Sequence, residues 1–252
     1  RLHKGIDTIV RSVLNDADVI IAASKATFKE VSSIITEVEK AHLIPNGIDI
    51  ERFKLNLDGS AIRRKLEVKE DRRIVFTLRR HEPKNGIEYL IRAIPIVIKN
   101  RNDAIFVIGG DGSLKKFHER LAVKLGIENN VIFTSNISFN EVPYYYAMSD
   151  IIVVPSIQEA FGLVVSEAMA CGKPVIGSKV GGIPDQIIDG YNGFLVRPKD
   201  ARAIAKKIIY LLNNPDEARH MGINGRKVVE TKFNIKKRTE KINALYEILA
   251  RQ

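Results

Sequence analysis

The chain has 252 residues, of which 45% are hydrophobic, and a formal net charge of +10 at pH 7. Its single cysteine, Cys171, excludes an internal disulfide framework, and no apolar run reaches the roughly eighteen residues of a membrane-spanning helix. The positive charge is compatible with nucleic acid, an anionic membrane surface or an acidic small substrate as partner. Most of the lysines fall on helical stretches, however, where a solvated helix face is the simplest explanation.

The first 50 residues predict one and a half βα units. Residues 16–24 read as a strand, 25–39 as a helix, and 42–49 as a strand that ends in a Pro-Asn-Gly turn. Residues 51–72 are charged and irregular, and we expect a linker there. Because the chain begins with Arg rather than Met, we also expect it to be a piece of a longer protein.

From residue 73 onward, short continuous apolar runs alternate with longer amphipathic ones. Strands of this kind are covered on both faces, so the pattern predicts an α/β fold with a Rossmann-like, doubly wound parallel sheet of about six strands. The expected strands are 73–79, 104–110, 131–135, 150–156, 174–178 and 193–196. The expected helices are 86–100, 113–125, 140–149, 162–171 and 200–213, the last capped by Asp200.

Residues 159–176, EAFGLVVSEAMACGKPVI, place two carboxylates around the start of a helix. The glycine at 162 lets the backbone approach a ligand, and the free amides of residues 162–164 open a helix that favours an anion such as phosphate. Glu159 and Glu167 can each accept hydrogen bonds from a diol on either side of that anion. This arrangement describes a nucleoside diphosphate sugar. The alternative is that the two acids only complement the helix dipole.

A second basic element follows the first strand of the set. Arg79, Arg80 and Lys84, in TLRRHEPKNG, come at the carboxyl end of that strand, where they can neutralise a diphosphate without a metal. The alternative is a polar turn. The five histidines are scattered and GGDG is not a dinucleotide-binding motif, so we expect neither a metal site nor a cofactor.

The stretch EAFGLVVSEAMACGKPVIGSKVGGIPDQIIDGYNGFLV resembles the retaining glycosyltransferases of family four, which have the GT-B fold. Glu159 and Glu167 match the family signature of a glutamate, seven residues and a second glutamate. The upstream stretch RRHEPKNGIEYLIRA is similar to the diphosphate element of the family, and the resemblance covers about residues 16–250.

The resemblance implies two Rossmann-like domains that face each other across a cleft. Residues 1–50 then correspond to a remnant of the N-terminal acceptor domain and its hinge, 51–233 to the sugar-nucleotide-binding domain, and 234–252 to a C-terminal helix that crosses back. The implied activity is metal-independent, retaining transfer of a hexose from a UDP-, GDP- or ADP-sugar. The acceptor is not identified by the resemblance. We expect a lipid-linked acceptor or a glycan, the former because of the positive charge of the chain, with the protein in the cytoplasm and in peripheral contact with a membrane. No nucleic-acid partner is expected. We expect the isolated chain to bind the donor without transferring sugar.

By position, the resemblance gives catalytic roles to Glu159, which contacts the donor sugar, and to Arg80 and Lys84, which face the diphosphate. Glu167 holds the nucleotide ribose. The resemblance also implies that five other residues bind the donor: Phe161, Gly162, Leu163, Val164 and Arg79.

One departure from the family pattern concerns position 85. Asn85 stands where the family often has a lysine, so Lys84 has to substitute from one place earlier, and either arginine of the pair can be the ligand. Two other functions stay open at this point. One is a sugar-nucleotide epimerase of the same fold, and the other is a non-catalytic binder of sugar nucleotides or nucleic acid.

Overall fold

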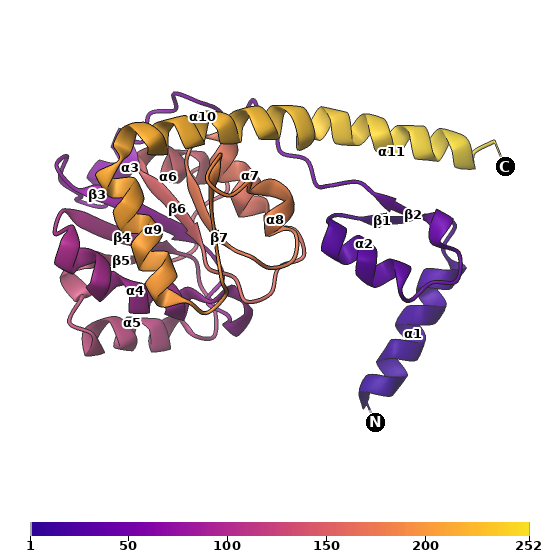
Figure 1. Ribbon diagram of the computed structural model, residues 1–252, viewed down its shortest axis with the longest axis horizontal. Helices are drawn as coiled ribbons and strands as arrows, with labels where there is room; N and C mark the ends of the chain where they lie inside the picture. The colour runs from indigo at the N-terminus through magenta and orange to yellow at the C-terminus, as the bar shows by residue number, and fades with distance from the viewer. Residues whose placement is uncertain (1, 252) are drawn as a thin grey trace.

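Six parallel strands form the central sheet of the protein (Figure 1). The computed structural model describes residues 2–251, with side chains from residue 7 onward. The strands are β3 (Arg73–Leu78), β4 (Ala104–Gly109), β5 (Val131–Thr134), β6 (Ile151–Val154), β7 (Val175–Ser178) and β8 (Gly193–Val196). They lie in the order β5-β4-β3-β6-β7-β8, and each neighbouring pair is parallel. The predicted Rossmann-like sheet is confirmed.

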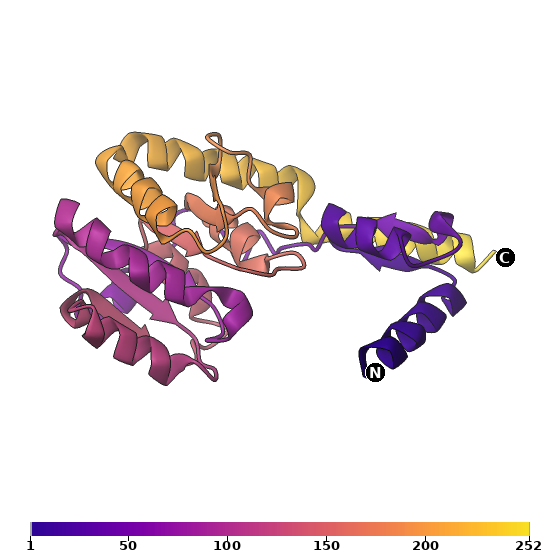
Figure 2. The same ribbon diagram turned by 60° about the horizontal axis from the view of Figure 1, so that its bottom comes forward.

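Helices cover both faces of this sheet (Figure 2). One face carries α4 (Ile87–Asn100), α5 (Lys115–Lys124) and α9 (Ala201–Asn213). The other carries α3 (Ser60–Lys65), α6 (Val142–Met148), α7 (Leu163–Ala170) and the short α8 (Ile183–Gln186). The long α10 (Pro215–Lys232) contributes to the cores on both faces of the sheet. Met221 packs in the core under α4, α5 and α9, and Val229 packs in the core on the opposite face.

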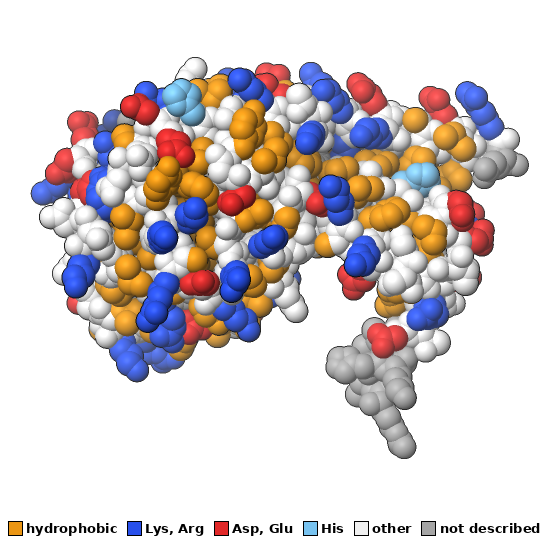
Figure 3. All heavy atoms as spheres, in the orientation of Figure 1, with side chains coloured by type: hydrophobic (Ala, Val, Ile, Leu, Met, Phe, Trp, Pro, Cys, Tyr) orange, Lys and Arg blue, Asp and Glu red, His pale blue; other side chains and the backbone are white. Residues whose placement is uncertain are grey.

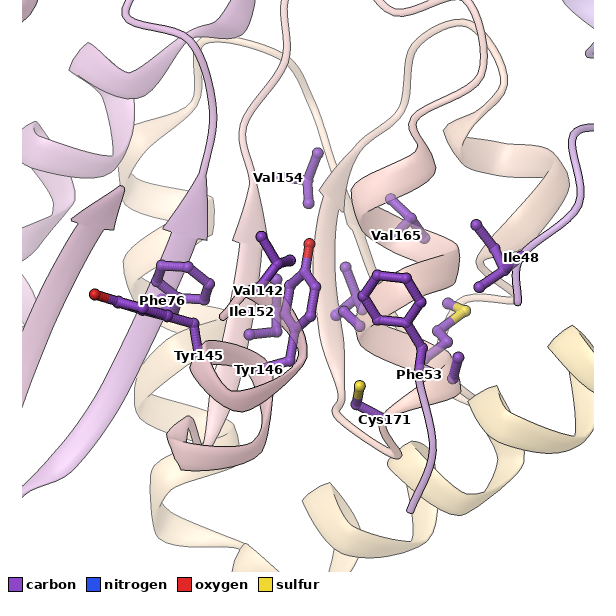
Figure 4. Close-up of a cluster of buried hydrophobic side chains, with 14 of the residues drawn as sticks. Ile48, Phe53, Phe76, Val142, Tyr145, Tyr146, Ile152, Val154, Val165 and Cys171 are labelled. Carbon is purple, nitrogen blue, oxygen red and sulfur yellow. The ribbon is translucent and has the colours of Figure 1, made fainter. Parts of the chain in front are cut away.

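The strand sequences read as uninterrupted apolar runs because both of their faces are buried. In β3, Ile74 and Phe76 pack in one core and Val75 in the other, and all three are 0% exposed. In Figure 4 the ring of Tyr146, from α6, stands between Phe76 and Phe53, at centroid distances of 5.8 and 6.1 Å. The helix α6, which contains three consecutive tyrosines, therefore packs in the core through Tyr145 and Tyr146.

The predicted cap of α9 is present, and a glycine ends α7. Asp200 Oδ1 accepts a hydrogen bond of 2.8 Å from the Ala203 amide at the start of α9. Gly172, directly after the end of α7, has a φ of +70°, the left-handed conformation that glycine adopts without strain. Local chemistry thus determines where these two helices begin and end.

Two segments differ from the sequence prediction. The expected linker at 51–72 contains α3, whose Ile62 is buried, so the prediction of an irregular linker is wrong at these residues. α10 was not predicted, because Gly222 and Gly225 weaken its local helical signal. Both glycines are buried where α10 crosses α7, and a Cβ on Gly222 would collide with the Gly172 carbonyl. Close helix packing, rather than propensity, explains this helix.

The N-terminal segment forms a small unit of its own beside the sheet (Figure 1). It consists of α1 (Leu2–Asp16), β1 (Ile20–Ala22), α2 (Lys25–Ser32) and β2 (Ala41–Leu43), with β1 and β2 parallel. Both strands and the helix between them are therefore shorter than predicted, and α1 was not predicted. The chain then passes the junction between α10 and α11 (Ile235–Leu249). There the Ile48 amide donates to the Phe233 carbonyl at 2.7 Å.

The division of the chain at residues 50 and 233 stays a prediction.

Among the described residues, no helix combines the length and the apolar character required to cross a bilayer.

Candidate active site

The candidate site is a cleft at the carboxyl ends of β3 and β6. The chain leaves β3 toward β4 and leaves β6 toward β7, so the two loops diverge and a crevice remains between them. Both loops line one cleft of about 580 Å³. Its lining includes five residues that the sequence pointed to: Arg79, Arg80, Lys84, Glu159 and Val164.

Arg79 joins the two loops from the inside. Its side chain is only 10% exposed, and Nη2 donates to Asn85 Oδ1 at 2.7 Å, Ser156 Oγ at 2.9 Å and Glu159 Oε2 at 2.6 Å. A charge-assisted contact of this kind is stronger than one between neutral groups. Arg79 therefore holds the Glu159 carboxylate in place, while Arg80 is the exposed arginine of the pair.

Asn85 accounts for the departure from the family pattern at this position. The side chain is 5% exposed, with Oδ1 accepting from Arg79 and Nδ2 donating to the Arg80 carbonyl at 2.7 Å. An ammonium group has no acceptor to offer Arg79. A lysine at 85 would therefore leave the arginine without one of its three partners.

Lys84 ties the two loops together through its backbone and leaves its side chain exposed. Its carbonyl accepts from the amides of Ile157 at 2.8 Å and Gln158 at 3.1 Å. Gly86 has a φ of +65°, and a Cβ there would collide with the Pro155 carbonyl. The loops thus approach each other backbone to backbone. Arg80 and Lys84 also border a second hollow of about 570 Å³.

The start of α7 offers unpaired amides next to this cleft. Gly162 precedes the helix with a φ of +90° and no side-chain cap, so the amides of Leu163 and Val164 lack partners, while that of Val165 donates to the Gly162 carbonyl at 2.9 Å. Val164 lines the cleft, whereas Leu163 is 44% exposed outside its lining. Phe161 turns inward, and its ring packs against Phe233 at 5.7 Å between centroids. Only its backbone is available to a ligand.

The loop that carries Glu159 rests on the turn formed by Gly181 and Gly182. Gly181 has a φ of +52°, and a Cβ on it would collide with the Glu159 carbonyl oxygen. The buried Gln186 accepts from the Ser166 hydroxyl and donates to the Phe161 carbonyl. This turn therefore sets the position of the Glu159 loop.

Glu167 lies further along α7, outside the lining of the cleft. Its Oε2 accepts a hydrogen bond of 2.8 Å from the Tyr146 hydroxyl. Burial raises the pKa of Glu167, although the Tyr146 hydrogen bond and the charge of Arg52 act in the opposite direction. With one oxygen committed to Tyr146, the second can accept a hydrogen bond from a ligand hydroxyl.

Arg52 and Phe139 extend the site in a way that no sequence motif indicated. The guanidinium carbon of Arg52 lies 3.0 Å from the centroid of the Phe139 ring, and Nη2 donates to the Phe139 carbonyl. Phe139 is 72% exposed. The Arg52 charge in this cation–π pair acts on Glu167.

A buried histidine pair lies behind the Arg80 loop. His81 and His118 are 0% and 1% exposed, and their Nδ1 atoms are 2.9 Å apart, so that one ring donates to the other. Burial lowers the pKa of both rings, and that of His118 falls to about 4. Lys115 lowers the pKa of His81 further, while Asp111 raises it. Both rings are therefore neutral at pH 7.

A family model described as "Glycosyl transferases group 1" matches residues 58–228. The chain belongs to this family. The matched region contains the whole six-stranded sheet and both loops of the cleft.

Two individual proteins are similar in sequence to most of this chain. The chain is 34% identical over 226 residues to a GDP-mannose-dependent alpha-(1-6)-phosphatidylinositol monomannoside mannosyltransferase of Mycolicibacterium smegmatis, covering 87% of this chain and 59% of that protein. It is 30% identical over 244 residues to N-acetyl-alpha-D-glucosaminyl L-malate synthase of Bacillus anthracis, covering 97% of this chain and 62% of that protein. The chain thus spans less than two thirds of the length of these relatives.

A solved structure shares the fold over nearly the whole chain. The crystal structure of HepE from Anabaena in complex with UDP and glucose superposes with a TM-score of 0.89 at 26% identity, covering 98% of this chain and 67% of that one. The likeness includes the N-terminal unit as well as the sheet, because it extends beyond the region that the family model matches.

The collision beneath the Glu159 loop predicts that Gly181→Ala destabilises this glycosyltransferase-family domain more than a matched change elsewhere. Gly190→Ala is the control, because its φ of +78° is also left-handed but no atom lies within 4 Å of the added Cβ. The control should lose about 1–2 kcal/mol of unfolding free energy, and Gly181→Ala about 1–3 kcal/mol more. Urea denaturation measures both, and equal losses would contradict the proposed support of the loop.

The histidine pair predicts a pH-dependent stability. The pKa of His118 is about 4 in the folded protein, against an ordinary value of 6.5, so the unfolded chain binds a proton that the folded chain rejects. The unfolding free energy should therefore fall as the pH drops from about 6.5 to 4, by roughly 3 kcal/mol for this ring.

His118→Gln should flatten that dependence in urea denaturation at pH 7, 6, 5 and 4. His220→Gln, at an exposed position of α10, should retain the wild-type slope. Glu88 raises the pKa of His118 and stays in place in both variants. An unchanged slope in His118→Gln would show that the pair does not control the pH response.

Proposed function

We propose that this chain is the donor-binding part of a retaining, metal-independent glycosyltransferase that moves a hexose from a nucleoside diphosphate sugar to an acceptor. One observation carries the proposal. The exposed cations Arg80 and Lys84, the open start of α7 and the anchored Glu159 carboxylate meet at one cleft. This is a set of groups that suits a diphosphate joined to a sugar.

The cations and the helix start supply the stabilisation that the reaction requires. When the bond between sugar and diphosphate breaks, negative charge grows on the departing diphosphate. In the proposal, Arg80, Lys84 and the free amides of Leu163 and Val164 are the donors that stabilise this charge in the transition state. They perform in this proposal the task that a bound metal ion performs elsewhere.

Glu159 orients the sugar in this mechanism rather than moving a proton. Arg79 and Ser156 both contact its Oε2, so its position is fixed and Oε1 remains to accept from sugar hydroxyls. Holding the sugar in the reactive geometry lowers the entropic part of the barrier. Glu167, steadied by Tyr146, is placed to accept from the ribose hydroxyls on the other side of the diphosphate.

The donor and acceptor classes rest on the relatives. One relative is named as GDP-mannose-dependent, and HepE was solved with UDP and with UDP-glucose. We infer a UDP-, GDP- or ADP-sugar as donor. The name of the Mycolicibacterium relative includes a phosphatidylinositol glycolipid. Together with the net charge of +10, this supports a lipid-linked acceptor and peripheral membrane contact for the proposed enzyme.

Removing the two exposed cations should abolish tight diphosphate binding. The double variant Arg80→Ala with Lys84→Ala should bind UDP, GDP or ADP at least ~10-fold more weakly, because each lost charged contact contributes about 1.5–3 kcal/mol. The matched control is Arg202→Ala with Lys206→Ala, which removes one arginine and one lysine from exposed positions of α9. Isothermal titration calorimetry with all three nucleotides measures the effect. Equal loss in the control, or no nucleotide binding by the wild type, would overturn the proposal.

Glu167→Gln should separate ribose recognition from diphosphate recognition. The amide keeps an oxygen for Tyr146 but removes the charge that strengthens a hydrogen bond to a ribose hydroxyl. We expect nucleotide affinity to fall about 10-fold while the affinity for inorganic pyrophosphate is unchanged. If pyrophosphate binding falls equally in the same calorimetric titrations, Glu167 has no specific role at the ribose.

A further inference from the structure

A separate polar hollow, here called the basic groove, lies where α10 ends and α11 begins. Its volume is about 410 Å³, and it shares no lining residue with the donor cleft. Its lining includes five cations and one carboxylate: Lys25, Lys232, Lys237, Arg238, Lys241 and Asp185. In Figure 3, lysine and arginine side chains border the hollow between these helices and the N-terminal unit.

Among the described residues, no ion pair neutralises the cations of the basic groove, although Lys237 Nζ donates to the Thr231 carbonyl at 3.3 Å. No salt bridge of the described residues engages any of the five. The single acid, Asp185, already accepts the Lys25 amide at 2.7 Å. The Nε of Arg238 is buried without a hydrogen-bond partner. Like charges gathered around one hollow repel one another, so an anion that enters it is stabilised by all of them.

The groove lies behind the wall of the donor cleft. Phe233 lines it, and the Phe233 ring packs against Phe161, which follows Glu159 in the cleft loop. Asp185 stands three residues after Gly182, on the turn that supports the same loop. A ligand in the groove is therefore separated from the Glu159 loop by one layer of side chains.

We propose that the basic groove is a second anion site, which holds a phosphate ester. This assignment goes beyond the proposed function, because the groove shares no lining residue with the donor cleft. Lysines supply point charges, and the Arg238 guanidinium offers the paired donors that match phosphate oxygens. Leu43, Ile44 and Pro45 line the same groove, so it also offers an apolar surface to the uncharged part of a phosphate ester.

The test measures the binding of a phosphate ester and the binding of a nucleotide separately on the same protein. The probes are glycerol 3-phosphate in solution and phosphatidylcholine vesicles with and without phosphatidylglycerol, each applied with the best-binding nucleoside diphosphate present and absent. The double variant Lys237→Gln with Arg238→Gln should bind the probe at least ~10-fold more weakly and the nucleotide unchanged within about twofold. The control, Lys236→Gln with Arg251→Gln, removes the same two residue types from exposed positions near the two ends of α11, outside the groove.

The two probes also identify the source of the phosphate. Binding of glycerol 3-phosphate assigns a soluble phosphate ester, and binding only to phosphatidylglycerol vesicles assigns a lipid head group. The inference is overturned if neither probe binds, if the control loses as much affinity as the groove variant, or if the probe displaces the nucleotide. Absence of nucleotide binding would instead contradict the proposed function, while the titration without nucleotide would still decide the groove.

Discussion

The site depends on one buried ion pair, that of Arg79 with Glu159, whose nitrogen and oxygen lie 2.6 Å apart. Burying two charges carries a large desolvation cost, which is offset only when their hydrogen-bonding capacity is also satisfied. Asn85 and Ser156, one from each loop, satisfy part of that capacity, whereas the Arg79 Nε stays buried without a hydrogen-bond partner. Because the three acceptors share one nitrogen, displacing any of them disturbs the others. The two loops of the cleft therefore behave as a single rigid unit.

The two adjacent arginines that follow β3 lie in different surroundings. Both line the cleft, but Arg79 is engaged by three acceptors and Arg80 is exposed. Arg79 turns inward to the ion pair, and Arg80 turns outward to the cleft. One cation organises the carboxylate and the other remains for a ligand. The sequence alone does not distinguish the arginine that supports the site from the arginine that is free to contact a ligand.

The second carboxylate owes its position to the hydrophobic core rather than to another charge. Tyr146 is fully buried between Phe53 and Phe76, and its hydroxyl reaches Glu167 on α7. The packing that stabilises the sheet therefore also orients this acid. The two glutamates of α7 and its preceding loop are held by unrelated means, an ion pair for one and a core tyrosine for the other. Each can be altered without removing the support of its counterpart.

By itself, the sequence determined the doubly wound sheet and two of the loops that line the cleft, because continuous β-branched runs and the polar residues that follow them are local signals. The loops after β4 and β5, which also line it, were not predicted. The tertiary structure alone decided the contacts within the site. Arg79 meets Glu159 across 80 positions, Arg52 meets Phe139 across 87, and His81 meets His118 across 37. The glycines of α10 are likewise explained only by the helix against which they pack. Such pairings follow from how strands and loops stack in space, and no local pattern of residues encodes that geometry.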